Sequence, residues 1–175
     1  MNRDQHLMVL SNIVVEQAKE HRAKLCFAES LTGGSLASAI VSVPGASEVF
    51  LGGIVAYQNV AKTELLQVSA ELIERHGVVS VAVARSMAQG GLKLFKQPSD
   101  PCVISVATTG VAGPGAQNGV PAGTYVVALA VDDFEQAHEF QFNGSREEVR
   151  AAAVSSALSM LKDYFEQKSA LPLGS

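Results

Sequence analysis

Apolar residues recur at helical spacing near the start of the chain, at Leu7, Leu10, Ile13, Val14 and Ala18. This spacing predicts a helix over residues 4–21 with one face toward a core. Short apolar runs at 24–28 and 53–57 each predict a strand. Between them, the small residues of 35–42 predict a helix that ends before a Pro-Gly pair.

The middle of the chain combines helical patterns with a buried strand. Helical spacing predicts three helices, over 60–66, 70–76 and 81–95. Residues 102–107 (CVISVA) are rich in β-branched side chains and predict a strand that is buried on both faces. A glycine-rich loop is expected to follow this strand over 110–123.

The last third of the chain predicts a hairpin and a long helix. Two runs at 124–131 and 135–142 predict a pair of antiparallel strands. Ser145, with Glu148 three positions later, has the spacing of a capping box and begins a helix that we expect over 145–167.

This order of elements predicts a three-layer α/β/α sandwich around a mixed sheet. The chain has 175 residues, a length typical of one domain. We expect a single domain over 1–167, followed by a flexible tail over 168–175.

Composition argues against several classes of partner. The net charge is -4, from 13 Lys and Arg against 17 Asp and Glu, which disfavours direct nucleic-acid binding or an anionic membrane surface.

Cys26 and Cys102 both fall in apolar runs and predict buried free thiols. Without a Cys/His cluster we expect no metal. The polar start and the short apolar runs predict no signal peptide and no membrane span, and a cytoplasmic protein.

The first candidate for chemistry is the segment ESLTGG at 29–34. Ser30 lies where the first strand turns into a helix, so its hydroxyl can face the end of the sheet. The amides of Thr32, Gly33 and Gly34 are expected to be unpaired at the helix start and able to stabilise an oxyanion. The alternative is that Ser30 or Thr32 simply caps the helix.

The second candidate is the pair Tyr57 and Lys62 in the segment YQNVAK. Lys62 falls on the first turn of the following helix, where the positive end of the helix dipole lowers a lysine pKa. A neutral lysine there can act as a general base. The alternative is a solvated lysine beside a half-buried tyrosine.

Two further segments indicate an anionic ligand. The loop TTGVAGPG at 108–115 follows the central strand, where ligands bind in open α/β sheets, and it fits neither a Walker P-loop nor GxGxxG. Arg146 begins the last helix, where an anion is favoured. The alternatives are a plain connecting loop and a capped surface helix. The four histidines are interpreted as surface or helix-end residues.

Taken in order, AESLTGG, GIVAYQNVAK, HGVVS, TTGVAGPGA with NGVPAGTY, and FNGSREEVR resemble the CinA family C-terminal domain and the stand-alone nicotinamide-mononucleotide amidases called PncC. The resemblance covers about residues 24–161. It implies an α/β/α fold with a mixed, mostly parallel five-stranded sheet and a homodimer. It also implies that nicotinamide mononucleotide (NMN) is deamidated to nicotinic acid mononucleotide and ammonia, without a cofactor.

The resemblance also implies roles for single residues. Ser30 matches the nucleophile of the family, and Tyr57 and Lys62 match the residues that activate it. The expected substrate-binding set is Thr32, Gly33, Gly34, Thr109, Gly110, Gly113 and Arg146. Leu31 departs from the cysteine that is usual there, so a cysteine nucleophile is not expected.

Two other functions remain open from the sequence. One is a non-catalytic nucleotide-binding module in a competence or DNA-damage response, which would need the glycine-rich loop and Arg146 but not Ser30, Tyr57 and Lys62 together. The other is an amidase for a different small carboxamide.

Overall fold

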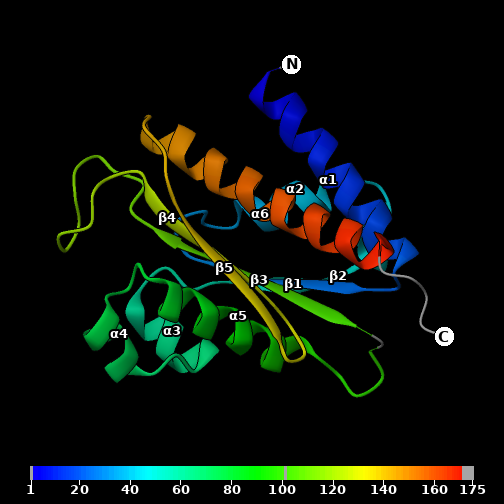
Figure 1. The fold of residues 1–175 in the computed structure, drawn as a ribbon, viewed down its shortest axis with the longest axis horizontal. Helices are drawn as coiled ribbons and strands as arrows, with labels where there is room; N and C mark the ends of the chain where they lie inside the picture. The colour runs from blue at the N-terminus through cyan, green and yellow to red at the C-terminus, as the bar shows by residue number, and fades with distance from the viewer. Residues whose placement is uncertain (1, 101, 171–175) are drawn as a thin grey trace.

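The computed structural model describes residues 2–100 and 102–170, which form one sheet with helices on both faces (Figure 1). The elements in chain order are α1 (Arg3–Glu20), β1 (Lys24–Glu29), α2 (Ser35–Val41), a short 3-10 helix η1 (Ala46–Glu48), β2 (Phe50–Val55), α3 (Asn59–Leu66), α4 (Ala70–His76), α5 (Val81–Phe95), β3 (Val103–Gly110), β4 (Thr124–Val131), β5 (Phe134–Gln141) and α6 (Arg146–Ala170).

The sheet has five strands in the order β2-β1-β3-β4-β5. β1 pairs in parallel with β2 and with β3, whereas β4 pairs antiparallel with both β3 and β5. Four of the five strands therefore point the same way, and only β4 opposes them. The predicted mixed, mostly parallel sheet is confirmed.

Two hydrophobic cores lie on opposite faces of this sheet. α1, α2 and α6 bury their apolar residues against one face, and α3, α4 and α5 cover the other (Figure 1). β3 and β4 are buried along almost their whole length because both faces are covered. The predicted three-layer sandwich is thus confirmed. No helix in residues 2–100 or 102–170 is long and apolar enough to cross a bilayer.

Several predicted boundaries are wrong. β2 begins at Phe50, not at 53. β3 extends to Gly110 because Thr108, Thr109 and Gly110 continue the ladder with β4, so they are strand and not loop. Cys102 precedes β3 and is only half-buried, whereas Cys26 is buried as predicted.

The predicted tail is also corrected at its start. α6 continues through residues 168–170, so this part of the chain is helical. The Lys168 ammonium lies 5.6 Å from the ring centroid of Tyr164, and the Ser169 hydroxyl donates to the carbonyl of Phe165 at 3.1 Å. Both contacts are made within the helix and support its last turn. The rest of the predicted tail, 171–175, lies outside the described residues.

A glycine in α5 allows α3 to pack closely against it. A Cβ atom added at Gly90 would lie 2.0 Å from the carbonyl oxygen of Leu66, the last residue of α3. That atom belongs to the backbone, so it cannot move aside as the end of a side chain can. Gly90 therefore fixes the distance between α5 and the helix that carries Lys62.

We expect Gly90→Ala to destabilise the protein by roughly 1–3 kcal/mol or more, which is typical of overpacking. The sign of this change in stability is informative. Alanine is a better helix former than glycine by about 1 kcal/mol, so without a clash the substitution would stabilise the protein. The free energy of unfolding in urea would measure the change. Arg85→Ala, at an exposed position of the same helix, is the control and is expected to have little effect. A Gly90→Ala protein as stable as the parent would contradict the predicted clash.

Candidate active site

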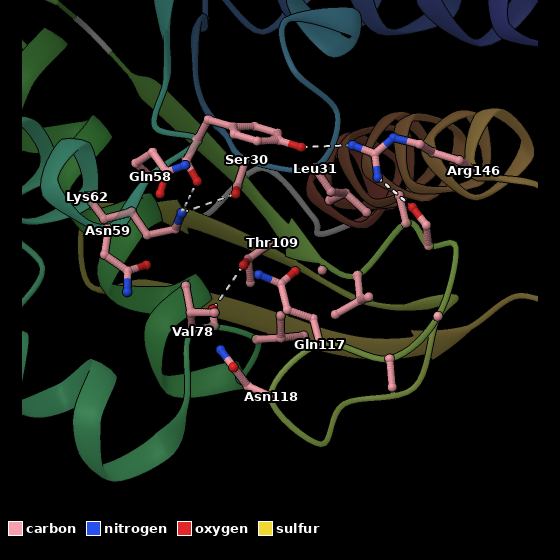
Figure 2. Close-up of a pocket in the computed structure, with 18 of the residues that line it drawn as sticks. Ser30, Leu31, Gln58, Asn59, Lys62, Val78, Thr109, Gln117, Asn118 and Arg146 are labelled. Atoms are coloured by element: carbon pink, nitrogen blue, oxygen red, sulfur yellow. Dashed lines mark hydrogen bonds between the residues drawn. The ribbon is translucent and has the colours of Figure 1, made fainter.

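Three parallel strands end at the same edge of the sheet and bring the predicted residues together. Ser30 directly follows β1, Tyr57 lies two residues beyond β2, and Gly110 ends β3. A cavity of about 660 Å³ opens at this edge (Figure 2). Ser30, Tyr57, Lys62, Thr109, Gly110, Gly113 and Arg146 all line it. This placement is the one expected for a ligand site in an α/β sheet.

Ser30 and Lys62 are buried residues of the cavity wall and are in direct contact. The Lys62 Nζ atom donates to the Ser30 Oγ atom at 3.1 Å (Figure 2). It also donates to the carbonyl oxygens of Ala56 at 2.7 Å and Tyr57 at 3.2 Å. The three acceptors hold the amine in one position beside the hydroxyl. This is the geometry required of a nucleophile and its base.

Burial makes Lys62 a stronger candidate for a base. The residue is only 1% exposed, and burial lowers its pKa to about 8. No carboxylate is among its hydrogen-bond partners in the described chain, so no counter-ion offsets this effect. The sequence predicted this direction of the pKa shift, and its cause in the structure is the removal of the amine from water.

The Tyr57 side chain does not lie between Lys62 and Ser30, which are in direct contact. The backbone carbonyl of Tyr57 contacts Lys62, but its phenol oxygen accepts a hydrogen bond from Arg146 at 2.8 Å. The side chain is 53% exposed. The same Arg146 guanidinium donates to the carbonyl of Gly113 at 2.6 Å (Figure 2). Arg146 thus bridges the end of β2 and the glycine-rich loop across the mouth of the cavity.

Thr109 lies on the wall of the cavity as a strand residue. Its hydroxyl donates to the carbonyl of Val78 at 2.9 Å and ties β3 to the segment between α4 and α5 (Figure 2). Gly113 adopts a positive φ of 89°, which suits glycine. Four amide side chains that the sequence did not single out also line the cavity: Gln58, Asn59, Gln117 and Asn118. They offer both donors and acceptors to a ligand.

Thr32, Gly33 and Gly34 do not line the cavity, and the expectation that their amides are all free is wrong. The Gly33 amide donates to the carbonyl of Ser30 at 3.1 Å, and the Gly34 amide donates to the Glu29 carboxylate at 2.9 Å. The Thr32 hydroxyl pairs with that of Thr108 at 2.7 Å. Within the described chain, only the Thr32 amide of these three lacks an acceptor.

Glu29 is a structural residue that the sequence analysis missed. Its carboxylate is 1% exposed and accepts from the amides of Gly34, Leu36 and Ala37 at 2.8–3.1 Å. A carboxylate at a helix start satisfies unpaired amides and favours the helix dipole. A charged residue at the end of an otherwise apolar strand, just before the candidate serine, was the available signal. Arg150, on α6, was also missed.

The lining of the cavity is positive although the whole chain is acidic. It includes the cations Lys62 and Arg146, and no Asp or Glu among the described residues. This charge favours an anionic ligand. The part of the chain that the structure describes contains no group of three or more His, Cys, Asp or Glu side chains placed to hold a metal ion.

Comparison with known proteins gives one consistent family. A family model described as the CinA C-terminal domain matches residues 8–165. A CinA-like protein from Prochlorococcus marinus is 40% identical over 163 residues, which cover 91% of this chain and 37% of that protein. The chain thus spans a little over a third of the length of the curated relatives that it matches.

Solved structures match over nearly the whole chain. A CinA superfamily protein from Klebsiella pneumoniae 700603 is 31% identical with a TM-score of 0.86, and the match covers 95% of this chain and 99% of that one. The competence/damage inducible protein CihA from Agrobacterium tumefaciens is 32% identical with a TM-score of 0.84, covering 93% and 96% of the two chains. Sequence and fold therefore point to the same family.

Proposed function

Because the chain belongs to the CinA C-terminal domain family, we propose that it is an amidohydrolase that converts NMN to nicotinic acid mononucleotide and ammonia. The observation that supports this proposal best is the contact of 3.1 Å between Ser30 Oγ and a buried Lys62 amine whose pKa is lowered to about 8. Burial of a lysine without a carboxylate partner is costly for stability. An amide hydrolase that uses a serine nucleophile needs a neutral base within hydrogen-bond reach of the hydroxyl.

The proposed reaction is acyl transfer through Ser30. Neutral Lys62 takes the Ser30 hydroxyl proton while Oγ forms a bond to the carboxamide carbon of NMN. The oxyanion then collapses, the C–N bond breaks, and the Lys62 ammonium returns the proton to the leaving ammonia. Water, deprotonated by Lys62, attacks the ester carbon and releases the acid, and the proton returns to Ser30 Oγ.

The charge of the cavity supports a nucleotide substrate. NMN carries a phosphate, and Arg146 is a cation at the mouth of the cavity that still has unused N–H groups beyond its bonds to Gly113 and Tyr57. Lys62 and Ser30 lie at the other end, where the carboxamide has to react. We therefore propose that the phosphate binds toward Arg146 and the pyridine ring toward Ser30.

The proposal is tested by incubating the purified chain with NMN, nicotinamide riboside and nicotinamide, and measuring ammonia and the acid product. Turnover of NMN well above the other two supports the proposed function. Saturable NMN binding without ammonia would instead favour the nucleotide-binding module, a role compatible with the competence/damage name of the Agrobacterium relative. Turnover of the smaller amides alone would identify an amidase with another substrate.

We expect Arg146→Ala to raise the KM for NMN by about 10-fold to 100-fold, since a hydrogen bond to a charged group contributes roughly 1.5–3 kcal/mol. Nicotinamide riboside lacks the phosphate and serves as the internal control, because its kcat/KM should change much less. Steady-state kinetics on both substrates measures the difference. Equal losses for the two substrates would show that Arg146 does not recognise phosphate and acts only through Tyr57 and Gly113.

A further inference from the structure

The turn that carries Ser30 is held from behind by an arginine outside the cavity. Arg150 lies on α6, one helical turn after Arg146, and is half-buried. Its Nε atom donates to the carbonyl of Leu31 at 3.0 Å. Its Nη2 atom donates to the carbonyl of Thr32 at 2.8 Å and to the hydroxyl of Ser35 at 3.0 Å. These contacts join α6 to three residues of a single turn.

In each of the two peptide groups that follow Ser30, the carbonyl accepts a hydrogen bond but the amide has no acceptor among the described residues. The Ser30 carbonyl accepts from the amide of Gly33 at 3.1 Å, and the Leu31 carbonyl accepts from Arg150. The amides of the same two peptides belong to Leu31 and Thr32, and neither has an acceptor within residues 2–100 and 102–170. Leu31 is 4% exposed and lines the cavity, whereas Thr32 is 0% exposed and does not. Unpaired buried amides are costly, and such groups in a native protein often await a ligand.

The planarity of the peptide links these observations. In a trans peptide the N–H points opposite to the C=O, so fixing a carbonyl fixes the direction of the amide in the same unit. The bond from the Gly33 amide to the Ser30 carbonyl therefore sets the direction of the Leu31 amide, and Arg150 holds the next peptide, between Leu31 and Thr32.

We propose that Arg150 is a positioning residue for the reaction: it holds the turn after Ser30 so that the amide of Leu31, which lines the cavity, stabilises the oxyanion formed on Ser30. The inference deepens the proposed function and rests on it for the nature of the substrate. It replaces the glycine amides expected from the sequence, which are already bonded. Arg150 does not line the cavity, so it acts through the turn and not on the substrate.

The test uses Arg150→Lys, which keeps the charge but loses the planar fork that contacts several acceptors at once. We expect kcat for NMN to fall at least about 10-fold, with KM within about twofold and the kcat/KM ionisation at an unchanged pH, because Arg150 contacts neither Lys62 nor the cavity. Arg150→Gln should reduce kcat further. Arg85→Lys, an exposed arginine on α5, is the matched control and should behave as the parent.

A second measurement separates this inference from the choice of substrate. Ser30 is treated with a fluorophosphonate, whose phosphorus oxygen needs the same Leu31 amide, and the rate of modification is followed by mass spectrometry with Ser30→Ala as the blank. If the parent reacts but does not hydrolyse NMN, the proposed substrate fails, and a slower Arg150→Lys reaction still supports positioning. If Ser30 were modified at the parental rate in both Arg150→Lys and Arg150→Gln, the positioning role of Arg150 would be overturned. A loss that matches the unfolded fraction, or a parent Ser30 that does not react at all, would overturn it too.

Discussion

Ser30→Ala is expected to reduce ammonia release from NMN by about 10⁴-fold or more, as loss of the nucleophile does in serine hydrolases. The fold should survive the change. The Ser30 side chain makes one hydrogen bond, to Lys62, and Lys62 keeps its bonds to the carbonyls of Ala56 and Tyr57. We therefore expect the free energy of unfolding to change by no more than about 1.5 kcal/mol.

Ser42→Ala provides the matched control for this experiment. Ser42 follows α2, and its hydroxyl bonds to the carbonyl of Ser38 within the helix, away from the cavity. It should keep parental activity. If Ser30→Ala retained activity within a few-fold of the parent, the nucleophile would have to be another group. Thr109 and Tyr57 carry the other hydroxyl groups of the described residues that line the cavity.

The family resemblance placed Ser30, Lys62 and Arg146 in one site, and the structure brings all three to one cavity. Each follows a strand or begins a helix, and the ends of parallel strands share one edge of the sheet. The capping box that begins α6 also formed as predicted, with the Ser145 amide donating to the Glu148 carboxylate at 2.8 Å and the Glu148 amide donating to the Ser145 hydroxyl at 3.4 Å. Such contacts span three positions and can be recognised from residue order.

The parts that the sequence missed depend on contacts between distant segments. Arg150 lies more than 100 positions from the Leu31 carbonyl that it contacts, and no spacing rule connects them. The extension of β3 through Thr109 depends on its pairing with Val126 in β4. Glu29 was a local miss: its carboxylate turns back onto the amides of α2, an orientation that residue order alone leaves open.

The most specific prediction for the proposed mechanism concerns Lys62. With a pKa of about 8, only about a tenth of the lysine is neutral at pH 7, so kcat/KM should rise with pH through an ionisation near 8. In Lys62→Arg the side chain stays protonated at every pH that the enzyme tolerates. We expect kcat/KM to fall by about 10²-fold to 10⁴-fold and the ionisation to disappear.

Two comparison variants make this result interpretable. Lys93→Arg, at an exposed position of α5, should keep the parental profile. Tyr57→Phe removes the phenol that accepts from Arg146 and leaves the backbone carbonyl that holds Lys62, so it should reduce activity less than Lys62→Arg. Near-parental turnover by Lys62→Arg would remove the lysine from proton transfer and leave Tyr57 as the leading candidate for the base.

The same lysine should also leave a signature in stability. Burial lowers the pKa of Lys62 in the folded state, so between about pH 8 and the higher pKa of a free lysine the unfolded chain binds more protons. The free energy of unfolding should therefore rise with pH across this window, because a buried charge that opposes folding below pH 8 is lost in the folded state.

In Lys62→Met this contribution should vanish, while other groups that titrate there are common to both proteins. Unfolding in urea at pH 7 and pH 9.5 measures the difference, and an identical pH dependence in the two proteins would mean that Lys62 is charged in the folded state and cannot accept the Ser30 proton.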